Sequence, residues 1–301
     1  MATASNFVNE DSAVDAELRD YFNVDMLAML SQGSTNDVRI ILSDGEITAN
    51  RDVLAARCEY FAAQFRWKEE TKDDSDSIEI MDCCKEVMLR IIKYLFTGSI
   101  KFKDLGLMQL LELVNQVRKL LLKGDLQGLI EKVIREEVIS FVKHKHSKSE
   151  TRLNLSCTDI IRGFQYADKF AIDGVRPLIF RSFVALLPWI ISRDDGAIAA
   201  FSSLSSQIVM EMFSQFPRFS IPKRNQRGLY SALVRCFLAW YQQNEDMCPN
   251  EKKKIFGMID LDLVNASDLF QVVKPSGLFP DVEVDRRIIE RLRERDEMKG
   301  E

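Results

Sequence analysis

Residues 36–61 read NDVRIILSDGEITANRDVLAARCEYF, and this stretch decides the fold of the chain. Apolar residues occupy every second position of 38–42, which predicts a strand with one buried face. Asp44 and Gly45 follow, and both residue types accept the positive φ of a tight hairpin turn. Residues 47–49 are expected to return as a second strand. The apolar residues beyond this point fall at helical spacing, so a helix should follow the hairpin directly.

The same stretch resembles the start of a BTB/POZ domain. Residues 36–38 stand in the place of that family's S-D-V strand, and residues 50–61 in the place of its H-R-x-V-L-A-A-R-S-x-Y-F segment. Asn50 replaces the usual His, and Cys58 replaces the usual Ser. Residues 94–98, YLFTG, are similar to the family's Y-L-Y-T-G segment. The signature residues on which the resemblance rests are Asp37, Arg51, Leu54, Tyr60 and Phe61.

This resemblance implies an α+β BTB/POZ domain, with helices around a small sheet, over residues 15–141. Residues 1–14 are expected to be a disordered N-terminus. Apolar spacing predicts a short strand at 78–80 and a helix that ends at Gly98, where glycine can form a left-handed cap. Another short strand is expected at 100–102, and helices are expected to continue to the end of the domain.

The second half of the sequence predicts helices throughout. We expect a polar, basic linker over 142–154, an all-α domain over 155–280, and a solvated, charged helix or tail over 281–301. The order of the segments FQYADKF (164–170), FSSLS (201–205) and VKPSGL (273–278) resembles the BACK domain that follows many BTB domains. The architecture is therefore similar to that of the Kelch-like family, without Kelch repeats. A basic stretch at 217–227 departs from this pattern.

Composition sets limits on the class of protein. The chain has 301 residues and a net charge of −5, so no global basic field attracts nucleic acid or an anionic membrane. The polar N-terminus does not resemble a secretory signal, and no run of about 20 apolar residues predicts a membrane span. We therefore expect a cytoplasmic and/or nuclear protein whose six cysteines are reduced thiols.

No pattern in the sequence predicts catalysis. Phosphate-loop, dinucleotide-binding and G-x-S-x-G motifs are absent from the sequence. The only two histidines, His144 and His146, lie in the basic linker and lack a third metal ligand nearby. Paired carboxylates such as Asp73-Asp74 lie in polar, loop-like stretches. We predict that the protein is not an enzyme and binds no cofactor or metal.

A helix is expected over residues 15–30, ending before a polar Ser-Gln-Gly-Ser segment. Its apolar stripe consists of Leu18, Phe22, Met26, Leu27 and Leu30. The BTB resemblance implies that a helix in this place forms much of a homodimer interface. An ordinary core helix would show the same stripe.

A second interface is implied by the segment after the signature helix. Trp67-Lys68-Glu69 resembles the φ-x-E motif that BTB adaptors place in a loop to bind cullin-3, although it falls earlier than usual. Trp67, Glu69, Tyr94 and Phe96 are the predicted cullin-binding residues. The alternative is that Trp67 folds back on the domain core.

Two functions follow from the resemblance. The first is a homodimeric substrate adaptor or scaffold of a cullin-3 RING ubiquitin ligase, which binds an unknown protein substrate. The second is a dimeric BTB scaffold in transcriptional or cytoskeletal assembly with no ligase role. No Kelch repeat or zinc finger follows residue 280 in this sequence, so substrate binding is expected to use the BACK-like region, the basic stretch or a partner.

Overall fold

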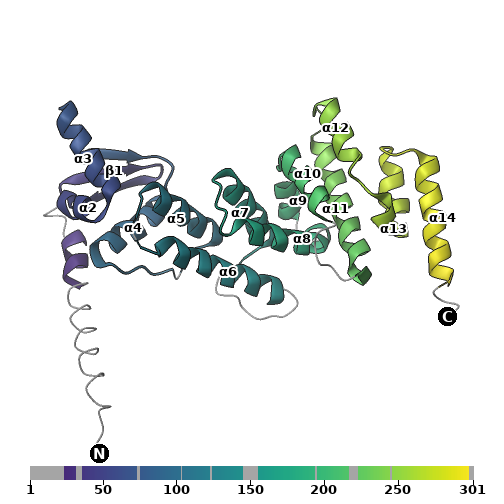
Figure 1. Cartoon of the computed structure of the whole chain (residues 1–301), viewed down its shortest axis with the longest axis horizontal. Coiled ribbons are helices and arrows are strands. Elements are labelled where there is room, and N and C mark those ends of the chain that lie inside the picture. The colour runs from purple at the N-terminus through teal and green to yellow at the C-terminus, as the bar shows by residue number, and fades with distance from the viewer. Residues whose placement is uncertain are drawn as a thin grey trace, which may run out of the picture. The chain divides into compact units, whose positions relative to one another are not determined.

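The structure is a computed structural model that divides into two compact units, Met1–Ile134 and Arg135–Glu301 (Figure 1). It describes residues 24–31, 36–72, 75–102, 104–122, 124–144, 155–193, 195–216, 223–244 and 246–297. The expected disordered segment 1–14 and most of the expected linker lie outside these residues. The division falls inside a helix, α6 (Leu126–His144). The domain boundaries drawn from the sequence therefore stay predictions.

A three-stranded sheet forms the centre of the first unit. The strands are β1 (Val38–Leu42), β2 (Gly45–Ala49) and β3 (Ser77–Ile80), in the order β2-β1-β3. β1 pairs with β2 antiparallel and with β3 parallel. Every second residue of β1 is buried, as the alternation predicted. The α+β class expected for this unit is confirmed.

The hairpin turn lies one residue earlier than expected. Leu42 pairs with Gly45, so Ser43 and Asp44 form the turn and Gly45 opens the returning strand. The Asp44 carboxylate accepts a hydrogen bond from the backbone N–H of Lys85 at 2.7 Å. This contact with a residue far along the chain holds Asp44 in the turn. Local residue preference alone did not predict that Ser43 and Asp44 form the turn.

The first unit also contains several helices. They are α2 (Arg51–Arg57), α3 (Glu59–Thr71), α4 (Lys85–Thr97), α5 (Leu107–Lys119) and the first part of α6. α4 ends at Gly98, whose φ of 69° is the predicted left-handed cap. The strand expected at 100–102 is absent from the described residues, because an alternation over three residues is too short to determine strand pairing.

The second unit is all-helical, as predicted. Its helices are α7 (Cys157–Lys169), α8 (Arg176–Arg193), α9 (Asp195–Ser202), α10 (Ser206–Gln215), α11 (Lys223–Gln243), α12 (Pro249–Phe256), η2 (Leu261–Leu263), α13 (Ala266–Asp268), η3 (Leu269–Val273), η4 (Lys274–Ser276) and α14 (Asp281–Glu297). Buried aromatic rings fill the core around α8 and α11. Trp240 is among them, and its indole N–H donates to the Leu204 carbonyl at 2.8 Å. Residues 217–222 of the basic stretch lie outside the described residues.

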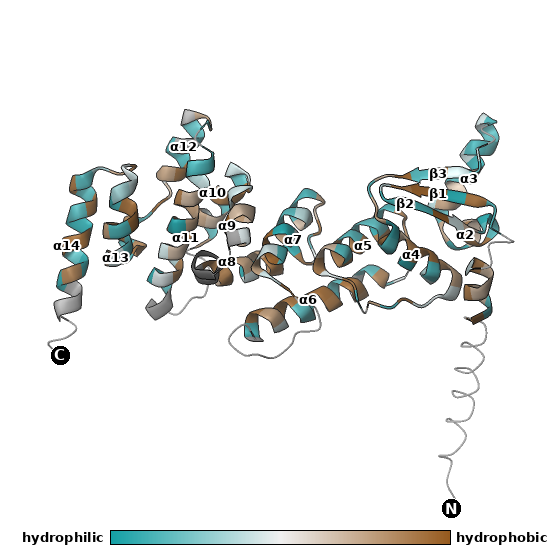
Figure 2. Cartoon of the chain, turned by 180° about the vertical axis from the view of Figure 1, so that it is seen from behind, coloured by the Kyte–Doolittle hydropathy of each residue, from teal (hydrophilic) through white to brown (hydrophobic). Residues whose placement is uncertain are grey.

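The C-terminal helix is not the freely solvated helix that its charge predicted. Figure 2 shows bands of hydrophobic colour along the mainly hydrophilic α14. Val284 on this helix is completely buried. Arg287 and Arg291 both form ion pairs with Asp262 in η2. Its charged residues therefore attach α14 to the rest of the second unit.

Candidate protein-interaction site

The beginning of α2 is held by two side-chain caps. The Asp37 carboxylate accepts a hydrogen bond from the backbone N–H of Arg51 at 2.7 Å. The Asn50 side chain accepts one from the N–H of Val53 at 3.0 Å. The first N–H groups of a helix have no partner within the helix, so both contacts stabilise this end. Asn50, which replaces the family's His, is thus an N-cap.

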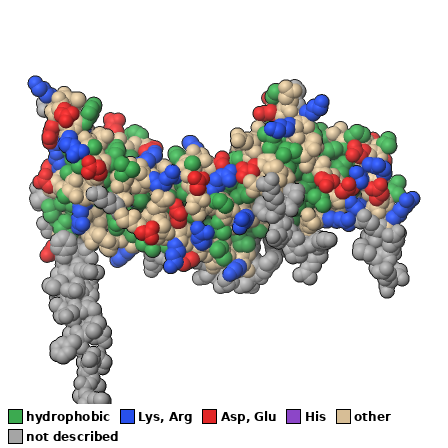
Figure 3. Space-filling model, viewed as in Figure 1, with side chains coloured by type: hydrophobic (Ala, Val, Ile, Leu, Met, Phe, Trp, Pro, Cys, Tyr) green, Lys and Arg blue, Asp and Glu red, His purple; other side chains and the backbone are tan. Residues whose placement is uncertain are grey.

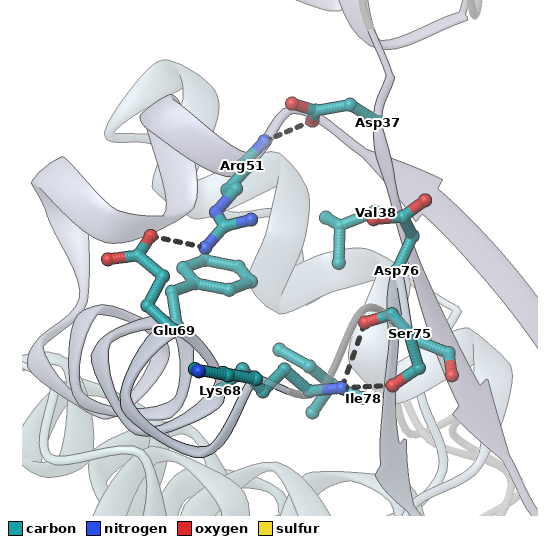
Figure 4. A pocket seen from close by; sticks show the side chains of 11 residues that line it. Asp37, Val38, Arg51, Lys68, Glu69, Ser75, Asp76 and Ile78 are labelled. Carbon is teal, nitrogen blue, oxygen red and sulfur yellow. Dashed lines mark hydrogen bonds and ion pairs between the residues drawn. The ribbon is translucent and has the colours of Figure 1, made fainter.

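The side chain of Arg51 reaches across to α3. One of its guanidinium nitrogens lies 2.7 Å from a carboxylate oxygen of Glu69. The guanidinium carbon lies 4.6 Å from the centre of the Phe65 ring, which is a cation–π distance. Figure 4 shows Arg51 between Asp37 on one side and Glu69 on the other. Arg51 therefore contacts both the signature residue Asp37 and the predicted site residue Glu69.

These residues border a pocket of about 480 Å³ between α3 and strands β1 and β3. On the α3 side, the Lys68 ammonium donates to the backbone carbonyl of Ser75 at 3.0 Å and to its hydroxyl at 2.5 Å. Arg51, Lys68 and Lys72 line the pocket, and so do Asp37, Glu69 and Asp76. Because cations and carboxylates are both present, the pocket has no strong preference for one sign of charge.

Trp67 lies on α3. The φ-x-E resemblance implied a position in a loop, so the structure differs from this expectation. Its side chain is 56% exposed. The alternative in which Trp67 folds back into the core is therefore not the arrangement in the structure. A large exposed aromatic ring beside ordered polar residues is a feature of protein-binding surfaces.

Phe96 was predicted as a cullin-binding residue, but it is completely buried. It belongs to the core face of α4 and cannot contact a partner in this arrangement. Tyr94 is half-buried and lines a second pocket, of about 290 Å³, together with Cys58 and Gly98. Burial raises the pKa of the Cys58 thiol, so the neutral form is favoured. Glu69 and Tyr94 thus line different pockets.

The predicted dimer helix is described over residues 24–31, so Leu18 and Phe22 lie outside the described residues. Leu30 is buried, and its carbonyl accepts a hydrogen bond from the Asn36 side chain at 2.9 Å. Met26 is half-buried, whereas Leu27 is 38% exposed. Val24, which the sequence stripe did not include, is also exposed. One side of this helix therefore packs on the domain while apolar residues remain at its surface.

The signature residues Leu54 and Phe61 are completely buried, while Tyr60 is half-buried. Burial raises the pKa of the Tyr60 hydroxyl. These three residues belong to the helical core of the first unit. These signature residues therefore stabilise the fold of the first unit.

The described residues also limit the other kinds of site that this part of the chain can form. No group of three or more His, Cys, Asp or Glu side chains there could hold a metal ion. No described helix is long and apolar enough to cross a membrane. All six cysteines are free thiols. Figure 3 shows basic and acidic side chains interspersed over one face.

Comparisons with known proteins agree with the resemblance for the first unit. Residues 26–129 match the family model of the BTB/POZ domain. BTB/POZ domain-containing protein 9 of Drosophila melanogaster is 22% identical over 300 residues, covering 97% of this chain and 35% of that protein. Human Rho-related BTB domain-containing protein 2 is 27% identical over 118 residues, covering 38% of this chain and 16% of that protein.

Solved structures are similar to part of the chain. The BTB (Tramtrack and Bric a brac) domain of human Gigaxonin is 21% identical, with a TM-score of 0.30, and the match covers 44% of this chain and 96% of that chain. This chain spans about a third of the length of the fly protein. The BACK-like character of the second unit stays a prediction.

Proposed function

We propose that this protein, whose residues 26–129 form a BTB/POZ domain, is a homodimeric adaptor that links a protein substrate to a cullin-3 ubiquitin ligase. The observation that supports this most directly is the exposed Trp67 on α3. Trp67 would enter an apolar pocket of the cullin. The neighbouring polar residues would form the rim of the interface.

The adaptor has no catalytic step of its own in this proposal. The BTB/POZ domain is a protein-interaction module, and the transfer of ubiquitin would belong to the partners. Val24 and Leu27 would contribute to the dimer contact, and the helical second unit would hold the substrate. The proposed place of action is the cytoplasm and/or the nucleus.

A second candidate is a dimeric scaffold in transcriptional or cytoskeletal assembly without a ligase role. One observation favours it: the Glu69 carboxylate is already paired with Arg51 within the chain. A glutamate in an intramolecular ion pair is less available to a partner. Direct binding of cullin-3 distinguishes the two candidates.

The test is a calorimetric titration of the folded, dimeric protein with the N-terminal domain of cullin-3. The adaptor proposal expects binding at one cullin per chain. Trp67→Ala should weaken this binding at least tenfold, because a buried aromatic anchor contributes on the order of 2 kcal/mol or more. Its melting temperature should change little, since the side chain is exposed in the free protein.

Met81→Ala is the matched control. Met81 is another large apolar residue of the first unit, and its exposure of 57% equals that of Trp67 within one per cent. This variant should bind cullin-3 as the unchanged protein does. Absence of binding by folded, dimeric protein would contradict the adaptor proposal and favour the scaffold.

A further inference from the structure

The last turn of α3, which carries Trp67, has features that weaken a helix end. Glu69 and Glu70 lie near its C-terminus, where the helix dipole disfavours negative charge. The residue that ends the helix, Lys72, has a φ of 55° in the left-handed region, although it is not a glycine. Both features favour fraying of this turn. Contacts from outside the helix are therefore needed to keep it formed.

Two such contacts are present, and they are made by Lys68 and Glu69, the two residues that follow Trp67. The Lys68 ammonium bonds to the backbone carbonyl and the hydroxyl of Ser75. The Glu69 carboxylate bonds to Arg51 at 2.7 Å, so a cation offsets its unfavourable place near the helix end. Figure 4 shows these two contacts on opposite sides of the pocket. Together they attach the last turn of α3 to α2 and to Ser75, just before β3.

Arg51 can serve as a firm attachment point because it is itself held. Its backbone N–H is bonded to the Asp37 carboxylate. Its guanidinium lies over the ring of Phe65, which is almost completely buried. Because its backbone and its guanidinium are both already in contact with other residues, Arg51 loses little further conformational entropy when it binds Glu69.

Helix geometry connects this attachment to the direction of Trp67. Successive residues of an α-helix are rotated by about 100°, so Trp67 points about 200° away from Phe65. When Phe65 and Glu69 contact Arg51, the rotation of this part of α3 is set. Trp67 then lies on the outward side, as its exposure shows.

We infer that Arg51 is a positioning residue for the Trp67 surface. It keeps the last turn of α3 formed by holding Phe65 and Glu69, and Glu69 acts through Arg51 and not by touching the partner. The consequence for cullin binding rests on the proposed function, whereas the consequence for the helix end does not.

The first test measures amide hydrogen exchange in the full chain. Arg51→Ala should speed exchange of the amides of residues 67–72 about fivefold, because it leaves the Glu69 charge unpaired near the helix end, whereas Glu69→Gln should speed it less, because it removes that charge together with the ion pair. Arg51→Ala keeps the backbone bond to Asp37, so α2 should remain formed. Unchanged exchange in both variants would overturn the inference.

The matched control for this test is Glu59→Gln. Glu59 pairs with Arg66 at 2.9 Å, so this variant also breaks an exposed ion pair of α3. It leaves all contacts of Arg51 in place. Exchange of residues 67–72 should then stay as in the unchanged protein; an equal acceleration would mean that any lost ion pair loosens the helix, which contradicts a specific role of Arg51.

The second test uses cullin-3 binding in a double-mutant cycle. Arg51→Ala should weaken binding about fivefold and Glu69→Gln less, and the double variant should bind no more weakly than Arg51→Ala. The exchanged pair, Arg51→Glu with Glu69→Arg, should recover part of the affinity, because it restores the ion pair but not the cation–π contact with Phe65. A purely destabilising effect would not be recovered in this way.

Two outcomes separate the possible failures. If Glu69→Gln weakens binding while Arg51→Ala does not, Glu69 contacts the partner directly and the inference is overturned. If the unchanged protein does not bind cullin-3 at all, the proposed function fails. The exchange comparison then still decides whether Arg51 positions the Trp67 turn.

Discussion

The carboxylate of Asp37 accepts a hydrogen bond from the backbone N–H of Arg51 at 2.7 Å, and this bond joins the residue before β1 to the first residue of α2. Asn50 caps the same helix through the N–H of Val53. Two of the unpaired N–H groups at the helix start are thus satisfied by different side chains. The Arg51 guanidinium remains available for α3.

The first prediction concerns these caps. Asp37→Ala and Asn50→Ala should each lower the free energy of unfolding of the first unit by about 1 kcal/mol, because each leaves a helix N–H group without its partner. Asn50→Asp should retain the stability, since aspartate caps equally well. Chemical denaturation followed by circular dichroism measures the change. Equal stability of Asn50→Ala and Asn50→Asp would contradict the capping role.

The second prediction follows from the burial of Phe96. Phe96→Ala should destabilise the first unit by about 3–5 kcal/mol, because it leaves a cavity in a packed core. Tyr94 lies on the same helix but is only half-buried, so Tyr94→Ala should destabilise the first unit clearly less. Thermal unfolding compares the two. A Phe96→Ala protein of normal stability that had lost cullin binding would instead support the original interface prediction.

The third prediction concerns a buried carboxylate in the second unit. Asp268 is 2% exposed, and its carboxylate is bonded to Arg235 at 2.5 Å and to Asn265 at 2.8 Å. Asp268→Ala should lower the free energy of unfolding by about 1–3 kcal/mol, because it removes the buried acceptor of the hydrogen bonds from Arg235 and Asn265. Asp285→Ala is the control, since Asp285 pairs with Lys274 at 2.5 Å but its side chain is 47% exposed. Chemical denaturation should show a loss below about 1 kcal/mol for this control.

The fourth prediction is a pH dependence of stability. Burial raises the pKa of Tyr230 from 10.0 to about 12, and the Tyr230 hydroxyl accepts a hydrogen bond from the Asp260 N–H at 2.7 Å. Below pH 10 the tyrosine is neutral in the folded and unfolded chain. Between pH 10 and 12 only the unfolded chain loses the proton, so stability should fall by about 1.4 kcal/mol per pH unit.

Tyr230→Phe isolates this contribution. The variant should be less stable than the unchanged protein at neutral pH by about 1 kcal/mol, because the Asp260 N–H loses its partner. The difference between the two proteins should shrink as the pH rises above 10. Denaturation curves recorded from pH 8 to 11 measure it, and a constant difference over this range would contradict the raised pKa.

The sequence alone was sufficient for features that depend on near neighbours in the chain. The alternation over 38–42 predicted β1, and the spacing before Gly98 predicted the end of α4. The signature residues identified the BTB/POZ domain, and the apolar spacing of the second half predicted its helices. The strand and helix patterns repeat every two or every three to four residues, and the signature residues lie close together in the chain, so both can be seen without knowledge of the fold.

Only the tertiary structure decided which groups meet across long stretches of sequence. The pairing of Arg51 with Glu69, the hydrogen bond from Lys85 to Asp44 and the ion pairs of α14 with Asp262 all join residues from separate elements. The burial of Phe96 and the exposure of Trp67 were decided in the same way. Sequence periodicity shows that a helix has an apolar face, but the neighbouring elements determine which side chains it buries and which remain in contact with solvent.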